Sequence, residues 1–156
     1  MPFGRLPKLF RHIAVFRWLK RISKETAMAQ IKIYGLRHRL NPIKTLLSDA
    51  IHTCVVDALA YPPEKRFHRF IELDWGDFIF PDDRSERYTI IEISLFEGRS
   101  VEAKKHLIRL LFERIEQDCG ITAQDLEITI FETPRHNWGI RGQPGDELGL
   151  NYKVEV

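Results

Sequence analysis

The second half of this chain repeats the pattern of the first half at an offset of 60 residues. Ile31-Lys32-Ile33 returns as Ile91-Glu92-Ile93, and Arg39 returns as Arg99. Three later positions also recur, in the pairs Lys44 and Lys104, Leu47 and Leu107, and Ile51 and Leu111. Each half contains a β-branched run, a bend ending in an arginine, an amphipathic helical stretch and a second apolar run. The sequence therefore predicts a duplicated βαβ unit in an α+β fold, with candidate sites in the turn after each first strand.

The first unit contains two predicted strands, over residues 30–36 and 67–73. Between them we expect a helix that ends near Leu59. Asn41 is its expected N-cap, and Pro42 its first helical residue, where the missing N–H costs nothing. The apolar stripe of this helix predicts five buried side chains: Leu46, Leu47, Ile51, Val55 and Leu59. A turn-rich insert over 74–84 follows, and its Phe78-Ile79-Phe80 run is expected to form a hairpin edge.

The second unit opens with a predicted strand over residues 88–96, whose nearly continuous apolar run indicates a central position in the sheet. Ser100 is expected to cap a helix over 101–118, and Gly120 to end it. A fourth strand is predicted over 126–132. The remaining residues are rich in Gly and Pro, with a last short strand expected over 150–154.

The charge of the chain is unevenly distributed. Residues 1–27 hold seven Lys or Arg and one acid, for a net charge of +6, whereas the whole chain carries +2. Residues 28–156 therefore carry −4, and the basic character belongs to the N-terminal segment. An acidic domain without a basic stripe gives no reason to expect a nucleic-acid partner.

The N-terminal segment has several interpretations. Apolar residues recur at helical spacing among the basic ones, so residues 5–24 could form an amphipathic helix with weak contact to an anionic membrane surface. An Arg-rich, acid-poor start is also typical of a transit peptide. Alternatively the segment has no dedicated role, or translation starts at Met28. We divide the chain into a basic extension, residues 1–28, and a folded domain, residues 29–156.

Cysteine and histidine usage argues against disulfide and metal frameworks. Cys54 and Cys119 both fall in predicted helices, and no Cys-X-X-Cys pair is present. We interpret them as reduced core residues of an intracellular, cytoplasmic protein. The six histidines are scattered and no Gly-rich phosphate loop follows a strand, so we expect neither a metal nor a cofactor.

Several separated motifs resemble the tautomerase superfamily, in particular its branch with malonate semialdehyde decarboxylase. They lie in order along residues 29–156: Pro63-Glu64-Lys65-Arg66-Phe67, Phe96-Glu97-Gly98-Arg99-Ser100, Asp118-Cys119-Gly120-Ile121 and Asn137-Trp138-Gly139-Ile140-Arg141-Gly142. The resemblance implies a four-stranded mixed sheet backed by two antiparallel helices. It also implies a homotrimer with sites near subunit boundaries.

The catalytic position of this superfamily differs in the present chain. The family uses an amino-terminal proline, whose secondary amine acts as a general acid or base near neutral pH. That position falls on Ala29. With the preceding residues attached, the Ala29 nitrogen is an amide that does not titrate. If translation began at Met28, processing would leave a free primary amine on Ala29, able in principle to abstract a proton or form an imine.

Four further positions are carried over from the decarboxylase branch. Its water-activating aspartate falls on Lys65, and the first of two carboxylate-binding arginines falls on Glu97. The second arginine matches Arg99, and an aromatic of the pocket wall matches Trp138. We hypothesise a Lys65–Glu97 ion pair at the former carboxylate site. Arg99 either binds a carboxylate or is a turn residue paired with an acid; Trp138 either lines a pocket or anchors the C-terminal segment.

Three functional hypotheses follow from these residues. The chain is an isomerase or lyase acting on a small oxo acid, with Ala29 and Arg99 as catalytic residues and Lys65, Glu97 and Trp138 as substrate-binding residues. Alternatively it is a pseudoenzyme, a non-catalytic trimeric ligand-binding or interaction module with a degenerate site. In the third hypothesis the basic segment tethers such a trimer to a membrane or a partner.

Overall fold

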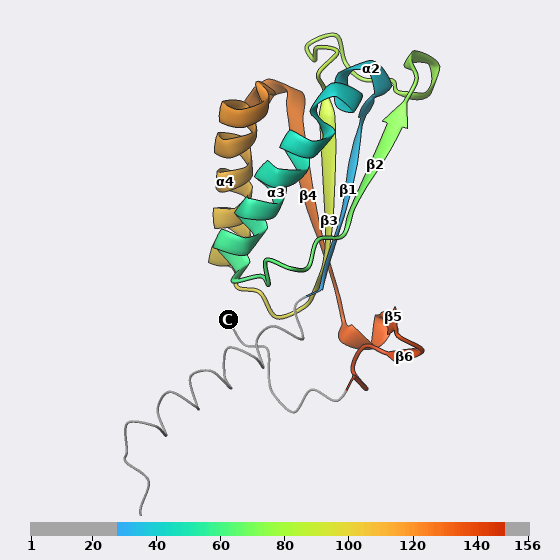
Figure 1. Ribbon diagram of the computed structural model, residues 1–156, viewed down its shortest axis with the longest axis vertical. Helices are drawn as coiled ribbons and strands as arrows, with labels where there is room; N and C mark the ends of the chain where they lie inside the picture. Colours follow the sequence, from blue (N-terminus) through green and yellow to red (C-terminus); the bar gives the residue numbers. More distant parts are fainter. Residues whose placement is uncertain (1–27, 149–156) are drawn as a thin grey trace, which may run out of the picture.

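The computed structural model describes residues 28–148, which form two consecutive βαβ units (Figure 1). The first unit consists of β1 (Ala29–Leu36), α2 (Arg37–Leu40), the 3-10 turn η1 (Asn41–Ile43), α3 (Lys44–Leu59) and β2 (His68–Leu73). After the turn η2 (Trp75–Asp77), the second unit consists of β3 (Thr89–Phe96), α4 (Val101–Cys119), η3 (Ala123–Asp125) and β4 (Leu126–Thr133). The turn η4 (Arg135–Asn137) and the short strands β5 (Gly139–Ile140) and β6 (Gln143–Pro144) follow.

The four long strands form one mixed sheet in the order β2-β1-β3-β4. β1 and β2 are parallel, β3 and β4 are parallel, and the two central strands are antiparallel, with Ala29 opposite Leu95 and Gly35 opposite Thr89. Helices α3 and α4 cover the same face of this sheet (Figure 1). The four-stranded mixed sheet with two helices that the resemblance implied is therefore confirmed.

The predicted 60-residue repeat is also present in the three-dimensional structure. β1 and β3 start and end 60 positions apart and share one pattern of buried and half-buried residues. α3 and α4 end at Leu59 and Cys119, and each is followed by a left-handed residue, Ala60 with φ of 49° and Gly120 with φ of 67°. Because the central strands are antiparallel, the repeat relates the two ends of the sheet to each other.

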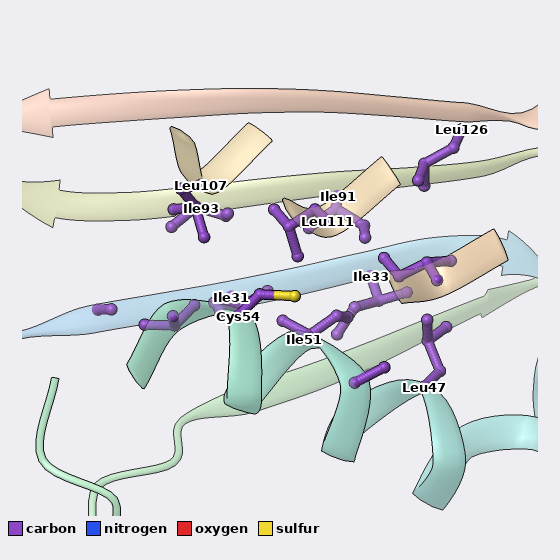
Figure 2. Packing of buried hydrophobic residues seen from close by; sticks show 14 of the residues in the cluster. Ile31, Ile33, Leu47, Ile51, Cys54, Ile91, Ile93, Leu107, Leu111 and Leu126 are labelled. Atoms are coloured by element: carbon purple, nitrogen blue, oxygen red, sulfur yellow. The ribbon is translucent and has the colours of Figure 1, made fainter. Parts of the chain in front are cut away.

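The core lies between the sheet and the two helices, and both units contribute side chains to it (Figure 2). Among the described residues, the twelve largest fully buried side chains come six from each half: Ile31, Ile33, Leu36, Leu40, Leu47, Ile51, Ile91, Ile93, Leu95, Leu107, Leu111 and Ile115. Full burial of such a side chain contributes roughly 1.5–3 kcal/mol. This shared core holds the strand ends and helix ends in fixed positions, and the candidate site is built from them.

The start of the first helix differs from the prediction. Asn41 lies inside a helical turn, with φ of −52° and ψ of −45°, and its side chain caps nothing. The helical path begins earlier, at Arg37, because buried Leu40 packs over Gly35, where an added Cβ would lie 2.9 Å from Leu40 Cγ. The prediction that Leu46 is buried is also wrong, since 47% of its surface is exposed. By contrast, Ser100 caps α4 as predicted, with its Oγ accepting from the Ala103 N–H at 3.1 Å.

The insert between the two units forms no strand at Phe78-Ile79-Phe80, contrary to the prediction. Instead, Phe78 and Phe80 pack against Tyr88, with ring centroids 5.4 and 5.3 Å away. The strand predicted over 150–154 and the basic segment lie outside the described residues. Among residues 28–148, no helix combines the length and the apolarity that crossing a membrane requires.

Candidate active site

The first residue of β1 lies where three structural elements meet. Ala29 is 3% exposed and sits opposite Leu95 near the end of β3. Its backbone N–H donates a hydrogen bond to the hydroxyl of Tyr61 at 3.2 Å. Tyr61 follows α3 by two residues and is itself 3% exposed. The backbone nitrogen at the position singled out by the sequence is therefore enclosed, with a tyrosine hydroxyl as its acceptor.

Arg99 belongs to the same group of residues. Its Nη1 donates to the carbonyl oxygen of Leu59, the last residue of α3, at 2.9 Å. This contact places a cation at a helix C-terminus, where the partial negative charge of the carbonyl groups favours it. Burial lowers the pKa of the half-buried Arg99 guanidinium, while the nearby Tyr61 and Glu132 oppose this shift. Arginine remains charged at neutral pH, so the site contains a partly desolvated cation.

Tyr61 is the residue that the sequence analysis failed to identify as part of the site. Burial raises the pKa of its hydroxyl, and the Ala29 N–H and the charge of Arg99 lower it in part. The hydroxyl is thus neutral at physiological pH and can both donate and accept a hydrogen bond. The 60-residue repeat contained a signal for it, because a polar tyrosine stands where the second unit has the apolar Ile121.

An ion pair completes the site. Lys104, near the start of α4, pairs with Glu132, near the end of β4. We call Ala29, Tyr61, Arg99, Lys104 and Glu132 the Ala29 cluster. Its two cations and one anion leave a net charge of +1, and each charged side chain is at least partly withdrawn from solvent. This arrangement can hold a small anion, because a carboxylate can replace water around Arg99 and accept the hydrogen bonds that the guanidinium donated to that water.

Lys65 and Glu97 flank this region in the fold. Lys65 is half-buried in the segment between α3 and β2, and its backbone N–H donates to Pro62 O at 3.0 Å. Glu97 is exposed directly after β3, and its backbone N–H donates to Thr133 O at 3.0 Å. The ion pair between their side chains stays a prediction.

Trp138 makes well-defined packing contacts at the start of the C-terminal hairpin. Its Nε1 donates to the Thr133 hydroxyl at 2.8 Å, and its ring meets Phe96 edge to face with centroids 5.0 Å apart. The guanidinium of Arg135 lies over the Phe96 ring, 5.6 Å from its centre. Trp138 thus anchors the hairpin to the end of β3; a role in substrate binding stays a prediction.

Comparison with protein families and curated proteins gives one consistent result. Residues 65–141 match the family model described as "Tautomerase enzyme". The chain is 31% identical over 101 residues to the probable tautomerase YrdN of Bacillus subtilis (strain 168), an alignment covering 62% of this chain and 77% of YrdN.

Solved structures extend this similarity to the whole fold. A malonate semialdehyde decarboxylase superposes with a TM-score of 0.66 at 26% identity, over 73% of this chain and 92% of its own. A fused 4-OT that forms an asymmetric trimer superposes with a TM-score of 0.68 at 25% identity, over 77% of this chain and 98% of its own.

Proposed function

This chain belongs to the tautomerase family, and we propose that its Ala29 cluster binds a small oxo acid at a site that has lost the family's catalytic amine. The observation that carries the proposal is the hydrogen bond from the Ala29 N–H to Tyr61, made by an internal amide beside the half-buried Arg99. The lone pair of an amide nitrogen is delocalised into the carbonyl group, so it cannot accept a proton at neutral pH. Position 29 therefore supplies a donor and no base.

Arg99 is the proposed anchor for the carboxylate of the ligand. Its guanidinium is partly desolvated and positioned by the Leu59 carbonyl, so little side-chain freedom is lost on binding. A charge-assisted hydrogen bond of this kind contributes roughly 1.5–3 kcal/mol. The Tyr61 hydroxyl oxygen accepts from the Ala29 N–H, and its own hydrogen can at the same time be donated to the oxo group or an enol oxygen.

Catalysis would require an Ala29 amine. If the chain were processed to begin at Ala29, the α-amine would lie beside Arg99 in an enclosed setting. Burial and a neighbouring cation both disfavour the charged ammonium, so the pKa of this amine would fall below the ordinary value of about 7.7–8.0. A neutral amine could then take a proton from the carbon next to the oxo group, which is the isomerase hypothesis, or form an imine, which is the lyase hypothesis.

The test compares the full chain with a chain beginning at Ala29, each with and without Arg99→Gln. Pyruvate binding is measured by calorimetry, and turnover is measured with malonate semialdehyde and with an enol of a 2-oxo acid. We expect the full chain to bind pyruvate without turnover, the shorter chain to show turnover, and Arg99→Gln to weaken binding by at least tenfold in both.

Three results would contradict the proposal. Equal turnover by the full and the shortened chain would show that the Ala29 nitrogen is not the missing base. Unchanged pyruvate binding in Arg99→Gln would show that Arg99 does not bind the carboxylate. No binding by either protein would favour the alternative of a non-catalytic interaction module.

We further propose a homotrimer, supported by the trimeric fused 4-OT, with sedimentation equilibrium as its test.

A further inference from the structure

We propose that a second pocket, at the opposite end of the sheet, binds a small organic monocarboxylate. This pocket lies where β3 begins and α4 ends, and its cavity volume is about 260 Å³. Six residues define what we call the Thr89 pocket: Leu36, Arg39, Leu40, Arg87, Thr89 and Ile121. The inference is independent of the proposed activity, since the pocket shares no residue with the Ala29 cluster.

The position of this pocket follows from the 60-residue repeat. Thr89 is the counterpart of Ala29, Ile121 that of Tyr61, and Arg39 that of Arg99. The repeat relates the two ends of the sheet, so the start of β1 at Ala29 has its counterpart in the start of β3 at Thr89. The duplicated unit thus provides two strand starts in similar positions, and different side chains surround each of them.

The floor of the Thr89 pocket is apolar. Leu36 and Leu40 are each 1% exposed, and Ile121 is 2% exposed. The Thr89 hydroxyl is directed into a local contact, since it donates to Arg87 O at 2.8 Å. An apolar ligand body can therefore enter without leaving a buried polar group of these residues unpaired.

The rim is cationic and one of its charges has no carboxylate partner. Arg39 donates to Glu86 through Nε at 2.9 Å and Nη2 at 2.6 Å, and His38 shares the same carboxylate at 3.2 Å. Arg87 instead donates through Nη1 to the neutral carbonyl oxygen of Gly120 at 3.1 Å. Within residues 28–148, Arg87 forms no ion pair with a carboxylate. Arg39, Arg87 and Glu86 together therefore give the rim a net charge of +1.

Gly120 holds Arg87 in this position. Its φ of +67° is favourable for glycine, and a Cβ at this residue would lie 3.1 Å from Arg87 Nη1. Glycine thus serves both the end of α4 and the close approach of the guanidinium to the last carbonyl groups. The remaining N–H donors of Arg87 form the expected contact for a ligand carboxylate.

The size and charge of the pocket select the ligand class. Ligand pockets usually measure about 300–1,000 Å³, so 260 Å³ fits only a small molecule. One uncompensated guanidinium matches one carboxylate, while the apolar floor disfavours a fully hydrated anion such as inorganic phosphate. A monocarboxylic acid with a compact apolar body matches both the apolar floor and the cationic rim of the pocket.

The experiment uses the full, ¹⁵N-labelled chain and the isosteric pair benzoate and benzamide. Titrations are followed by the amide resonances of Thr89 and Gly120, in an Arg99→Gln background that removes the anchor of the Ala29 cluster. We expect benzoate to shift both resonances in a saturable manner, and benzamide to bind at least tenfold more weakly. Arg87→Gln should weaken benzoate binding by at least tenfold.

A second variant tests the volume of the pocket rather than the charge of its rim. Cys119 also lines the pocket, and Cys119→Phe should fill it and abolish the benzoate shifts while leaving Arg87 in place. Equal affinity for benzamide and benzoate, unchanged affinity in Arg87→Gln, or absence of saturable shifts at Thr89 and Gly120 would each overturn the proposal. If Arg87→Gln does not fold, Cys119→Phe and the benzoate–benzamide ratio still decide it.

Discussion

The Ala29 end and the Thr89 end of the sheet have similar backbones and different chemistry. At the first end, Arg99 donates to the last carbonyl of α3 and Tyr61 accepts from the strand. At the second end, Arg39, the counterpart of Arg99, is instead paired with Glu86, and Arg87 takes the carbonyl next to α4. The repeat thus conserves positions that set the fold, whereas the side chains around the two proposed sites differ.

The same contrast appears along the rest of the two units. Buried apolar positions match across the repeat, as with Ile33 and Ile93 or Leu47 and Leu107. Several polar positions do not match: Ser48, His52 and His68 in the first unit correspond to Ile108, Phe112 and Ile128 in the second. Substitutions that exchange a residue for its counterpart therefore test which differences between the halves have physical consequences.

The largest effect is expected where Leu40 packs over Gly35. Their counterparts are Ser100 and Leu95, so the second unit fills this space with the strand residue instead. Leu40→Ala should lower the free energy of unfolding by about 2–5 kcal/mol through the lost burial and the cavity. Gly35→Ala should lower it by about 1–3 kcal/mol, because the new Cβ would lie 2.9 to 3.2 Å from Leu40 carbons.

The double variant sharpens this test. Leu40→Ala removes the three carbons nearest to the Cβ at position 35, so Gly35→Ala should then cost little. Urea denaturation of the four proteins gives the coupling free energy. Additive losses would mean that the two residues act independently, and would remove our explanation for the early start of the helical path.

A smaller effect is expected from His68, at the start of β2. Its Nδ1 lies 2.8 Å from the Ser48 hydroxyl, and its ring lies 6.0 Å from that of His52. Burial, and then the charges of His52 and Arg66, lower the pKa of His68 from 6.5 to about 4, with Asp49 opposing. Between these values the unfolded chain binds a proton that the folded chain does not. Stability is therefore complete above pH 6.5 and decreases as the pH falls toward 4.

The counterpart residue provides the matched variant. After allowance for solvent screening of a half-buried group, the loss between pH 7 and pH 4 should be about 1–2 kcal/mol. His68→Ile, which installs the residue found at Ile128, should remove most of this dependence, whereas substituting the exposed His106 with Gln should preserve it. An unchanged pH slope in His68→Ile, measured by urea denaturation at several pH values, would place the titrating group elsewhere.

The sequence predicted the fold well because the elements depend on local patterns. Strand and helix bounds agree within a few residues, since alternation and helical spacing are read from neighbouring positions. Its errors involve long-range packing: Phe78 and Phe80 looked like a strand edge but pack on Tyr88 from the next element. Asn41 carried a good capping signal, which the burial of Leu40 over Gly35 overrides.

The candidate site was only partly predictable for the same reason. The positions of Ala29 and Arg99 follow from the repeat and the family motifs, and both lie in the cluster. No local pattern marks Tyr61 as part of a site, because its contact with Ala29 joins residues 32 positions apart. Sequence order alone does not bring residues together at such separations, so the hydroxyl acceptor required the fold.

The smallest expected difference concerns the starts of the two long helices. In α4, the Ser100 hydroxyl accepts the Ala103 N–H at 3.1 Å, which satisfies one of the N–H groups left unpaired in the first turn. In the first unit, the corresponding chain enters through a helical turn, and the Asn41 side chain accepts no such bond. Ser100→Ala should therefore lower the free energy of unfolding by about 1 kcal/mol, and Asn41→Ala by no more than a few tenths. Thermal unfolding of both variants beside the parent chain measures the difference. An equal loss in the two would mean that Asn41 stabilises its helix after all, and that the two units differ less at their helix starts than the contacts of Ser100 and Leu40 indicate.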